Sequence, residues 1–155
     1  MSVNSLTIMT AMKDALINSG EFEKAQVCIS EFVNVSRDAA AGGWLGIYKN
    51  RNEYDPNTLG VQASLNKWKF VGVYTIVVQF ATYESGETCV TYLDTLVNKA
   101  VDIIFSDVTI AGVVDLIKRV DVNYSFVPDF ESDEGDDEVY FQQAMIDVEL
   151  EVDRR

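Results

Sequence analysis

Histidine is absent from this chain of 155 residues, and its absence removes several kinds of catalytic site. Histidine is the commonest general base, the usual partner of a serine or cysteine nucleophile and the commonest zinc ligand. The motifs GxxxxGK[ST], GxGxxG, GxSxG and HExxH are absent too, so phosphate loops, nucleophile elbows and zinc helices lack their signatures. We therefore expect a protein that is not an enzyme and that needs no cofactor.

Cysteine and long apolar runs are also scarce. Cys28 and Cys89 lie far apart and outside any CxxC spacing, which favours two partly buried thiols in a reducing cytoplasm over a disulfide or a metal site. No run approaches the roughly 20 apolar residues of a membrane helix, and the N-terminus lacks the pattern of a signal peptide. The sequence predicts a chain without a membrane span or a secretion signal.

Cationic side chains are fewer than anionic ones. Lys and Arg number 12 against 25 Asp and Glu, which gives a formal net charge of -13. Such a surface repels the phosphate backbone, so specific binding to nucleic acid is not expected. A negative surface can nevertheless suit a protein that DNA passes without adhering, because like charges repel.

The chain does contain enough apolar material for one core. Hydrophobic residues make up 48% of the sequence and aromatic residues 11%. A chain of this length usually forms one domain, which buries about two thirds of its unfolded surface. Neither a linker nor an internal repeat divides residues 1–155, so we expect a single domain.

Two segments have the periodicity of amphipathic helices. The first runs from Ser5 to Ser19, with Asn4 or Ser5 as the N-cap and Gly20 as the left-handed stop. The second runs from about Ser85 to Phe105. The expected buried stripes are Leu6, Met9, Met12 and Leu16 in the first helix and Val90, Leu93, Val97, Ala100 and Ile104 in the second.

Other apolar segments have the composition of strands. Trp68 to Tyr83 is the longest and is expected to cross the middle of the sheet, while Trp44 to Tyr48 is expected to be a short buried strand. Lys49 to Gly60 is rich in turn-forming residues and predicts a surface excursion. Glu21 to Ala41 is ambiguous between a short strand and a loop.

Two alternating segments near the C-terminus, Val114 to Val127 and Met145 to Asp153, predict a hairpin around an acidic loop. The resulting order is helix, strands, helix, strands. This order predicts an α+β fold with an antiparallel or mixed β-sheet and two α-helices packed on one face, because each layer then buries the apolar side of the other.

The acidic loop, Asp129 to Glu138, holds seven carboxylates that could bind a hard cation such as calcium. The calcium-loop template fails here. Its glycine position is occupied by Glu134 and its bidentate position by Tyr140. A solvated hairpin loop is the favoured interpretation.

The last strand has an unbroken acidic side formed by Asp147, Glu149, Glu151 and Asp153. Like charges in a row repel one another, so the arrangement calls for an explanation. One explanation is ordinary exposure to solvent. The other is that Asp147, Glu149 and Glu151 line a negatively charged channel or meet a basic partner.

One concentration of cations flanks the polar excursion. It consists of Lys49, Arg51, Lys67 and Lys69. These side chains either serve solubility or meet the acidic side of a neighbouring copy, in a head-to-tail contact of the kind that closes a ring.

Several segments together carry a family resemblance. They are the N-terminal amphipathic helix, Trp44-Leu45-Gly46-Ile47-Tyr48, a loop with Tyr54, Asp55, Pro56 and Leu59, the long strand and helix, Ser106 to Asp115, and two final strands ending in alternating acids. In pattern and order, over nearly the whole chain, they resemble the tail-terminator and tail-completion proteins of long-tailed bacteriophages. Glu21 to Gly43 departs from that pattern.

The resemblance implies a virion structural protein that forms a hexameric ring at the head-proximal end of the tail tube, ends tube polymerisation and provides the head-attachment surface. The implied partners are further copies, the tail-tube protein and a head-completion or neck protein, with DNA passing through unbound. Assembly would take place in the host cytoplasm. A head-to-tail connector or neck protein remains an alternative, as does an unrelated acidic binding module or small metal-dependent enzyme.

Overall fold

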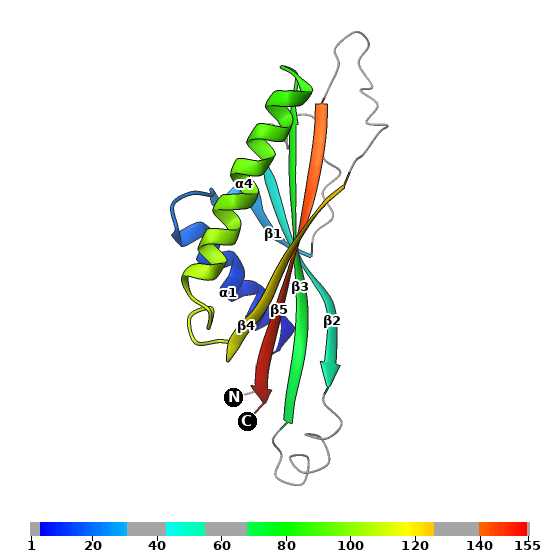
Figure 1. The fold of residues 1–155 in the computed structure, drawn as a ribbon. Helices are drawn as coiled ribbons and strands as arrows, with labels where there is room; N and C mark the ends of the chain where they lie inside the picture. Colours follow the sequence, from blue (N-terminus) through cyan, green and yellow to red (C-terminus); the bar gives the residue numbers. More distant parts are fainter. Residues whose placement is uncertain (1–3, 31–42, 55–67, 126–139, 155) are drawn as a thin grey trace.

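A computed structural model describes residues 4–30, 43–54, 68–125 and 140–154 of the chain. These residues form two α-helices, one 3-10 turn and a sheet of five strands (Figure 1). In chain order the elements are α1 (Ser5–Asn18), η1 (Lys24–Gln26), β1 (Val27–Ile29), β2 (Trp44–Tyr54), β3 (Trp68–Thr82), α4 (Gly86–Ser106), β4 (Leu116–Ser125) and β5 (Tyr140–Arg154).

The strands are arranged in the order β1-β2-β3-β5-β4. β1 runs parallel to β2, and every other neighbouring pair is antiparallel, so the sheet is mixed. β3 is the central strand and pairs with β5 from Trp68 opposite Arg154 to Thr82 opposite Tyr140. The predicted central strand and the predicted C-terminal hairpin are both confirmed, the hairpin by the pairing of β4 with β5.

Both helices lie on the same side of the sheet (Figure 1). α1 packs on β1 and β2, and α4 packs on β3 and β5. The helices and the sheet enclose one core, because alternate strand residues point toward the helices. Its fully buried members include Ile8, Met12, Leu16, Leu93, Ile76, Ile146 and Leu150. The predicted α+β fold is therefore confirmed.

The ends of α1 follow the predicted pattern, whereas its buried stripe differs from it by one position. The side chain of Asn4 accepts a hydrogen bond from the Thr7 amide at 2.8 Å, and Gly20 has a left-handed φ of 80° after the last turn. Ile8, Met9, Met12 and Leu16 are buried, but Leu6 is 60% exposed. The prediction for Leu6 was wrong because residues spaced by three or four cover a broad arc, and packing decides which edge of that arc is buried.

α4 begins at the predicted place, with the Ser85 hydroxyl accepting from the Thr88 amide at 3.0 Å. Its buried stripe contains Cys89 where Val90 was predicted, and Val90 is 45% exposed. The thiol of Cys89 lies 3.6 Å from the carbonyl oxygen of Phe80 and 3.5 Å from that of Tyr140, and burial raises the pKa of the thiol. Neither this helix nor any other in the described residues is long and apolar enough to cross a membrane.

β2 extends beyond its predicted end at Tyr48, which corrects part of the predicted surface excursion. Residues 49–54 continue the strand and pair with β3, with an irregularity in the register between Lys49 and Arg51. The long neighbouring strand supplies partners for the backbone, and this pairing outweighs the local preference for turns. Residues 55–60 of the predicted excursion lie outside the described residues. The ambiguous segment from Glu21 to Ala41 contains β1, and its residues 31–41 lie outside the described part of the chain.

A tight turn links α4 to β4 and is held by the carboxylate of Asp107. The carboxylate accepts hydrogen bonds from the Thr109 hydroxyl at 2.7 Å, the Thr109 amide at 3.0 Å and the Ala111 amide at 2.8 Å. These bonds support three successive residues with positive φ, namely Ile110, Ala111 and Gly112. The hydroxyl contributes most to lowering the pKa of Asp107, and the two amides add to the effect.

The Asp107 turn gives a prediction about acid stability. A carboxyl whose pKa is lowered in the folded state stabilises that state above its unfolded pKa, and this contribution is lost as the pH falls through the folded pKa. We expect Asp107→Ala to lower the melting temperature at pH 7, with the difference from wild type narrowing below about pH 4. Thermal unfolding between pH 7 and pH 3 measures this difference. The same change at exposed Asp115, which makes none of these contacts, is the control, and a pH-independent difference for Asp107→Ala would contradict the assignment.

Candidate interaction surfaces

The sheet face that points away from α1 and α4, here called the outer face, carries most of the candidate residues. The strand pairing places Arg51, Val73, Glu149 and Arg119 in one row across β2, β3, β5 and β4. The next row contains Tyr48, Thr75, Asp147 and Asp121. Residues that are far apart in the sequence therefore meet on one surface.

A chain of hydrogen bonds joins three strands of the outer face. The amide nitrogen of Asn50 donates to the Thr75 hydroxyl at 3.1 Å, and this hydroxyl donates to the Asp147 carboxylate at 2.6 Å. Asn50 is the extra residue at the irregularity in β2, where a bulge turns the side chain toward the outer face. Thr75 is only 7% exposed, so the chain of bonds is partly shielded from water.

The acidic side predicted for the last strand is present on β5. Asp147, Glu149 and Glu151 are half-buried on the outer face, while Ile146, Val148, Leu150 and Val152 are buried toward the helices. Asp147 is bound by Thr75, and the Glu151 carboxylate lies 3.9 Å from the Lys118 ammonium. The acidic row is thus partly compensated within the chain.

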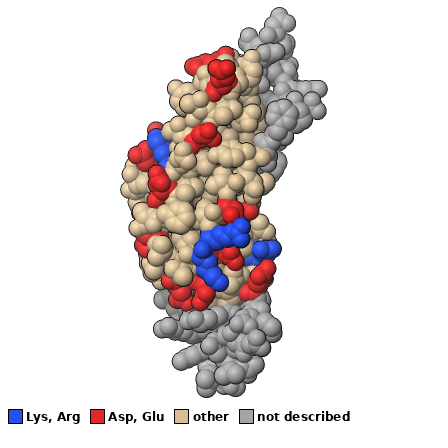
Figure 2. All heavy atoms as spheres, viewed as in Figure 1, with Lys and Arg blue, Asp and Glu red and all other residues tan. Residues whose placement is uncertain are grey.

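Sequence reasoning missed the cations that flank this acidic row on β4. Arg119 is opposite Glu149 in the strand pairing, and its guanidinium lies 2.8 Å from the Asp121 carboxylate. In the view of Figure 2, Lys and Arg atoms gather on the lower part of the described surface, beside Asp and Glu. The alternation of residues 119–125 was a signal for the strand, but only the hairpin register shows which acids meet these cations.

The predicted basic group is divided by the fold. Lys49 is opposite Tyr74, whose side chain belongs to the core, and Arg51 is opposite Val73 on the outer face, so these two cations point to opposite sides of the sheet. The Arg51 guanidinium lies 3.6 Å from Glu53, with both side chains 62% exposed. Lys69 lies on β3 opposite Asp153, and Lys67 lies outside the described residues.

An aromatic cluster covers Gly46 on the outer face. A Cβ at this position would lie 2.4 Å from a ring carbon of Trp44 and 2.8 Å from one of Tyr48, so no larger residue fits without moving a ring. Trp44 is 5% exposed, and its indole N–H has no hydrogen-bond partner within the part of the chain that is described. Glycine at position 46 therefore allows the rings to pack flat against the sheet.

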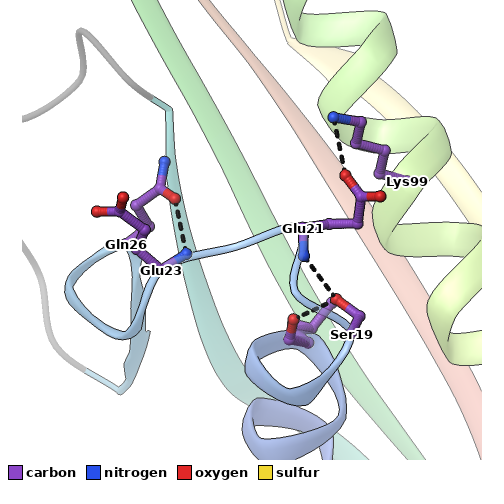
Figure 3. Close-up of polar contacts among 6 residues, drawn as sticks. Ser19, Glu21, Glu23, Gln26 and Lys99 are labelled. Atoms are coloured by element: carbon purple, nitrogen blue, oxygen red, sulfur yellow. Dashed lines mark hydrogen bonds and ion pairs between the residues drawn. The ribbon is translucent and has the colours of Figure 1, made fainter.

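A second surface is a groove between α1 and the C-terminal half of α4. Its volume is about 1080 Å³, and the turn after α4 closes one end. Figure 3 shows its border, where Glu21 follows α1 and its carboxylate lies 3.1 Å from the Lys99 ammonium on α4. The Glu21 amide donates to the Ser19 hydroxyl at 3.2 Å, which holds the chain in position for this ion pair.

The structure gives no support to a metal centre in the residues it describes. Within 4–30, 43–54, 68–125 and 140–154, no three Cys, Asp or Glu side chains gather closely enough to hold a metal ion. The acidic segment from Asp129 to Glu138, which was the candidate for a cation, lies outside these ranges.

The hydrogen-bond chain on the outer face gives a prediction about stability. Thr75→Val keeps the shape of the side chain but removes the hydroxyl, so we expect the free energy of unfolding to fall by about 1 to 2 kcal/mol. A double-mutant cycle with Asp147→Ala, measured by urea unfolding, should show a coupling of about 1 kcal/mol. Thr82→Val, at the far end of β3, is the matched control and should cost less. Additive effects of the Thr75 and Asp147 changes would show that their bond contributes nothing.

Comparison with protein-family models and with curated proteins gives no match for this sequence. The interpretation of both surfaces therefore depends on the residues and geometry of this chain and on the resemblance in segment order.

Proposed function

We propose that this chain is a non-catalytic structural subunit, which forms a ring at the head-proximal end of a phage tail tube, ends tube growth and provides the surface for head attachment. The observation that carries the proposal is the arrangement of charges on the outer face. There, cations and acids of β2, β5 and β4 lie in register across a broad surface, and the central strand β3 contributes Val73 and Thr75 between them. A subunit that acts by docking needs such a surface.

The layering of the fold supports this function. Both helices and the apolar side of the sheet are used to build the core. The other side of the sheet carries charged and aromatic groups on the same rigid strands. Rigid strands position a docking surface well, because its side chains need little further ordering when a partner binds.

The charge distribution is also suited to head-to-tail contact. Arg51 is exposed on the outer face of β2, near one edge of the sheet, and the acidic residues of β5 lie on the same face two strands away. Lys49 points to the opposite side of the sheet and does not belong to this surface. Cations of one copy can face acids of the next when the same contact repeats around a ring. Acids that remain unpaired in the assembled ring would give the passage a negative wall, which lowers adhesion of DNA.

The oligomeric state tests the proposal directly. Size-exclusion chromatography with light scattering and negative-stain imaging should show rings, either for the isolated protein or after addition of tail-tube protein. A protein that stays monomeric at high concentration in both conditions would contradict the proposal. Binding to a head-completion protein without any binding to tail-tube protein would instead favour a neck protein.

Neutralising the acidic side of β5 gives a sharper prediction. Asp147→Asn, Glu149→Gln and Glu151→Gln together should weaken assembly, because they remove the charge attraction between neighbouring copies. They should also reduce the dependence of assembly on salt, because salt screens only interactions between charges. The matched control is the triple change Glu23→Gln, Glu84→Gln and Glu87→Gln, which removes the same charge from exposed positions off the outer face. Ring yield at 50 and 500 mM salt is the measurement. A triple β5 variant that assembles like wild type would reject a role for these acids.

A further inference from the structure

The groove between α1 and α4 lies apart from the outer face, and the proposed ring contacts do not use it. Its volume of about 1080 Å³ is slightly above the range for small-molecule sites, roughly 300 to 1,000 Å³. Apolar side chains from both helices and from the following turn line it, among them Ala11, Ile103 and Val113. Leu6 also lines it and is 60% exposed, although most leucines of this chain that the structure describes are buried.

The charges around the groove have one predominant sign. Among the described residues that line it, the acids are Asp14, Glu21, Asp102 and Asp107, and Lys99 is the one cation. Lys99 is engaged by Glu21 at 3.1 Å. The Asp107 carboxylate is held by the hydrogen bonds of its turn, so Asp14 and Asp102 are the acids that lack such contacts and have no cation among the described lining residues, around an apolar floor.

From this combination we infer that the groove binds an amphipathic, basic helix of a partner protein. A helix that lays its apolar face into a hydrophobic groove is a common mode of peptide recognition. The 14 residues of α1 give a wall about 21 Å long, enough for roughly four turns of a second helix alongside it. Lysine or arginine on the edges of the bound helix would meet Asp14 on one side and Asp102 on the other.

Charge complementarity favours a different protein over a second copy of this chain. α1 contains one cation, Lys13, and α4 contains one, Lys99, which is already paired. The same helices also carry acids, so neither presents a basic face to an acidic groove. The inference depends on the groove alone, and its failure would leave the proposed ring unaffected.

The test uses the full chain and a fluorescein-labelled peptide of 16 residues made of leucine and lysine, with leucine at helical spacing. Two control peptides are a scrambled sequence of the same composition and an amphipathic peptide with glutamate in place of lysine. Fluorescence anisotropy at 150 mM salt measures the dissociation constants. We expect the amphipathic basic peptide to bind at least about tenfold more tightly than either control.

Variants of the protein then locate the binding site of the peptide. Asp14→Lys with Asp102→Lys should weaken binding of the basic peptide by about tenfold, since each exposed ion pair contributes modestly and two are lost. Glu84→Lys with Glu87→Lys, at the opposite end of α4, makes the same change of charge and should have little effect. Leu6→Ser should weaken binding several-fold, and Val90→Ser, at another exposed apolar position in a helix, should not.

Three outcomes would overturn the inference. Equal binding of the scrambled peptide, or equal loss with the Glu84 and Glu87 changes, would show only diffuse attraction to an acidic protein. Loss of self-association in Leu6→Ser would assign the groove to a second copy. Binding of neutral lipid vesicles that Leu6→Ser abolishes, without specific peptide binding, would assign it to a membrane surface.

Discussion

The antiparallel pairing of β3 with β5 forms the centre of the sheet and sets its register. The two strands match over their whole length, and every other strand joins the sheet through one of them or through β2. Because side chains alternate along a strand, this one register decides which residues face the helices and which face outward. A shift by one residue would turn Ile146, Val148 and Leu150 outward and bury the acids between them.

The same alternation divides the sheet into an apolar face that builds the core and a charged outer face. On the side of the helices, Leu93 and Val97 of α4 and Met12 and Leu16 of α1 complete a core with the apolar strand residues. On the outer face, Thr75 joins Asn50 to Asp147, and the remaining charges lie in rows between neighbouring strands. This separation of the charged groups from the core supports the proposal that the protein is a subunit of a larger structure.

The two proposed contacts use different parts of the fold and different physics. The outer face offers charges of both signs, which favours contact with a surface of similar composition such as another copy. The groove between α1 and α4 offers an apolar floor, with Asp14 and Asp102 lacking a cation among the described lining residues, and this combination favours a basic amphipathic helix from another protein. A structural subunit with both surfaces could assemble with its own kind through one and recruit a partner through the other.

Much of the fold could be predicted because its elements have strong local signals. Three of the four residues predicted for the α1 stripe, the Ser85 cap and the alternation of β5 correspond to the structure, and so do the α+β class and the central position of β3. Predictions failed where several faces or partners were equally compatible with the local pattern. Val90 and Leu6 are exposed although both have helical spacing, and residues 49–54 form a strand because β3 is there to pair with them.

The order of the helices and of the strands other than β1, the acidic side of β5 and the lack of histidine chemistry could be predicted from the amino-acid sequence, because these are properties of composition and short-range periodicity. Three features became visible in the folded chain alone: Lys49 and Arg51 lie on opposite faces, Arg119 flanks Glu149, and α1 and α4 leave an acidic groove between them. These features depend on strand register and on helix packing. Both are set by contacts between residues far apart in the chain, which no local pattern encodes.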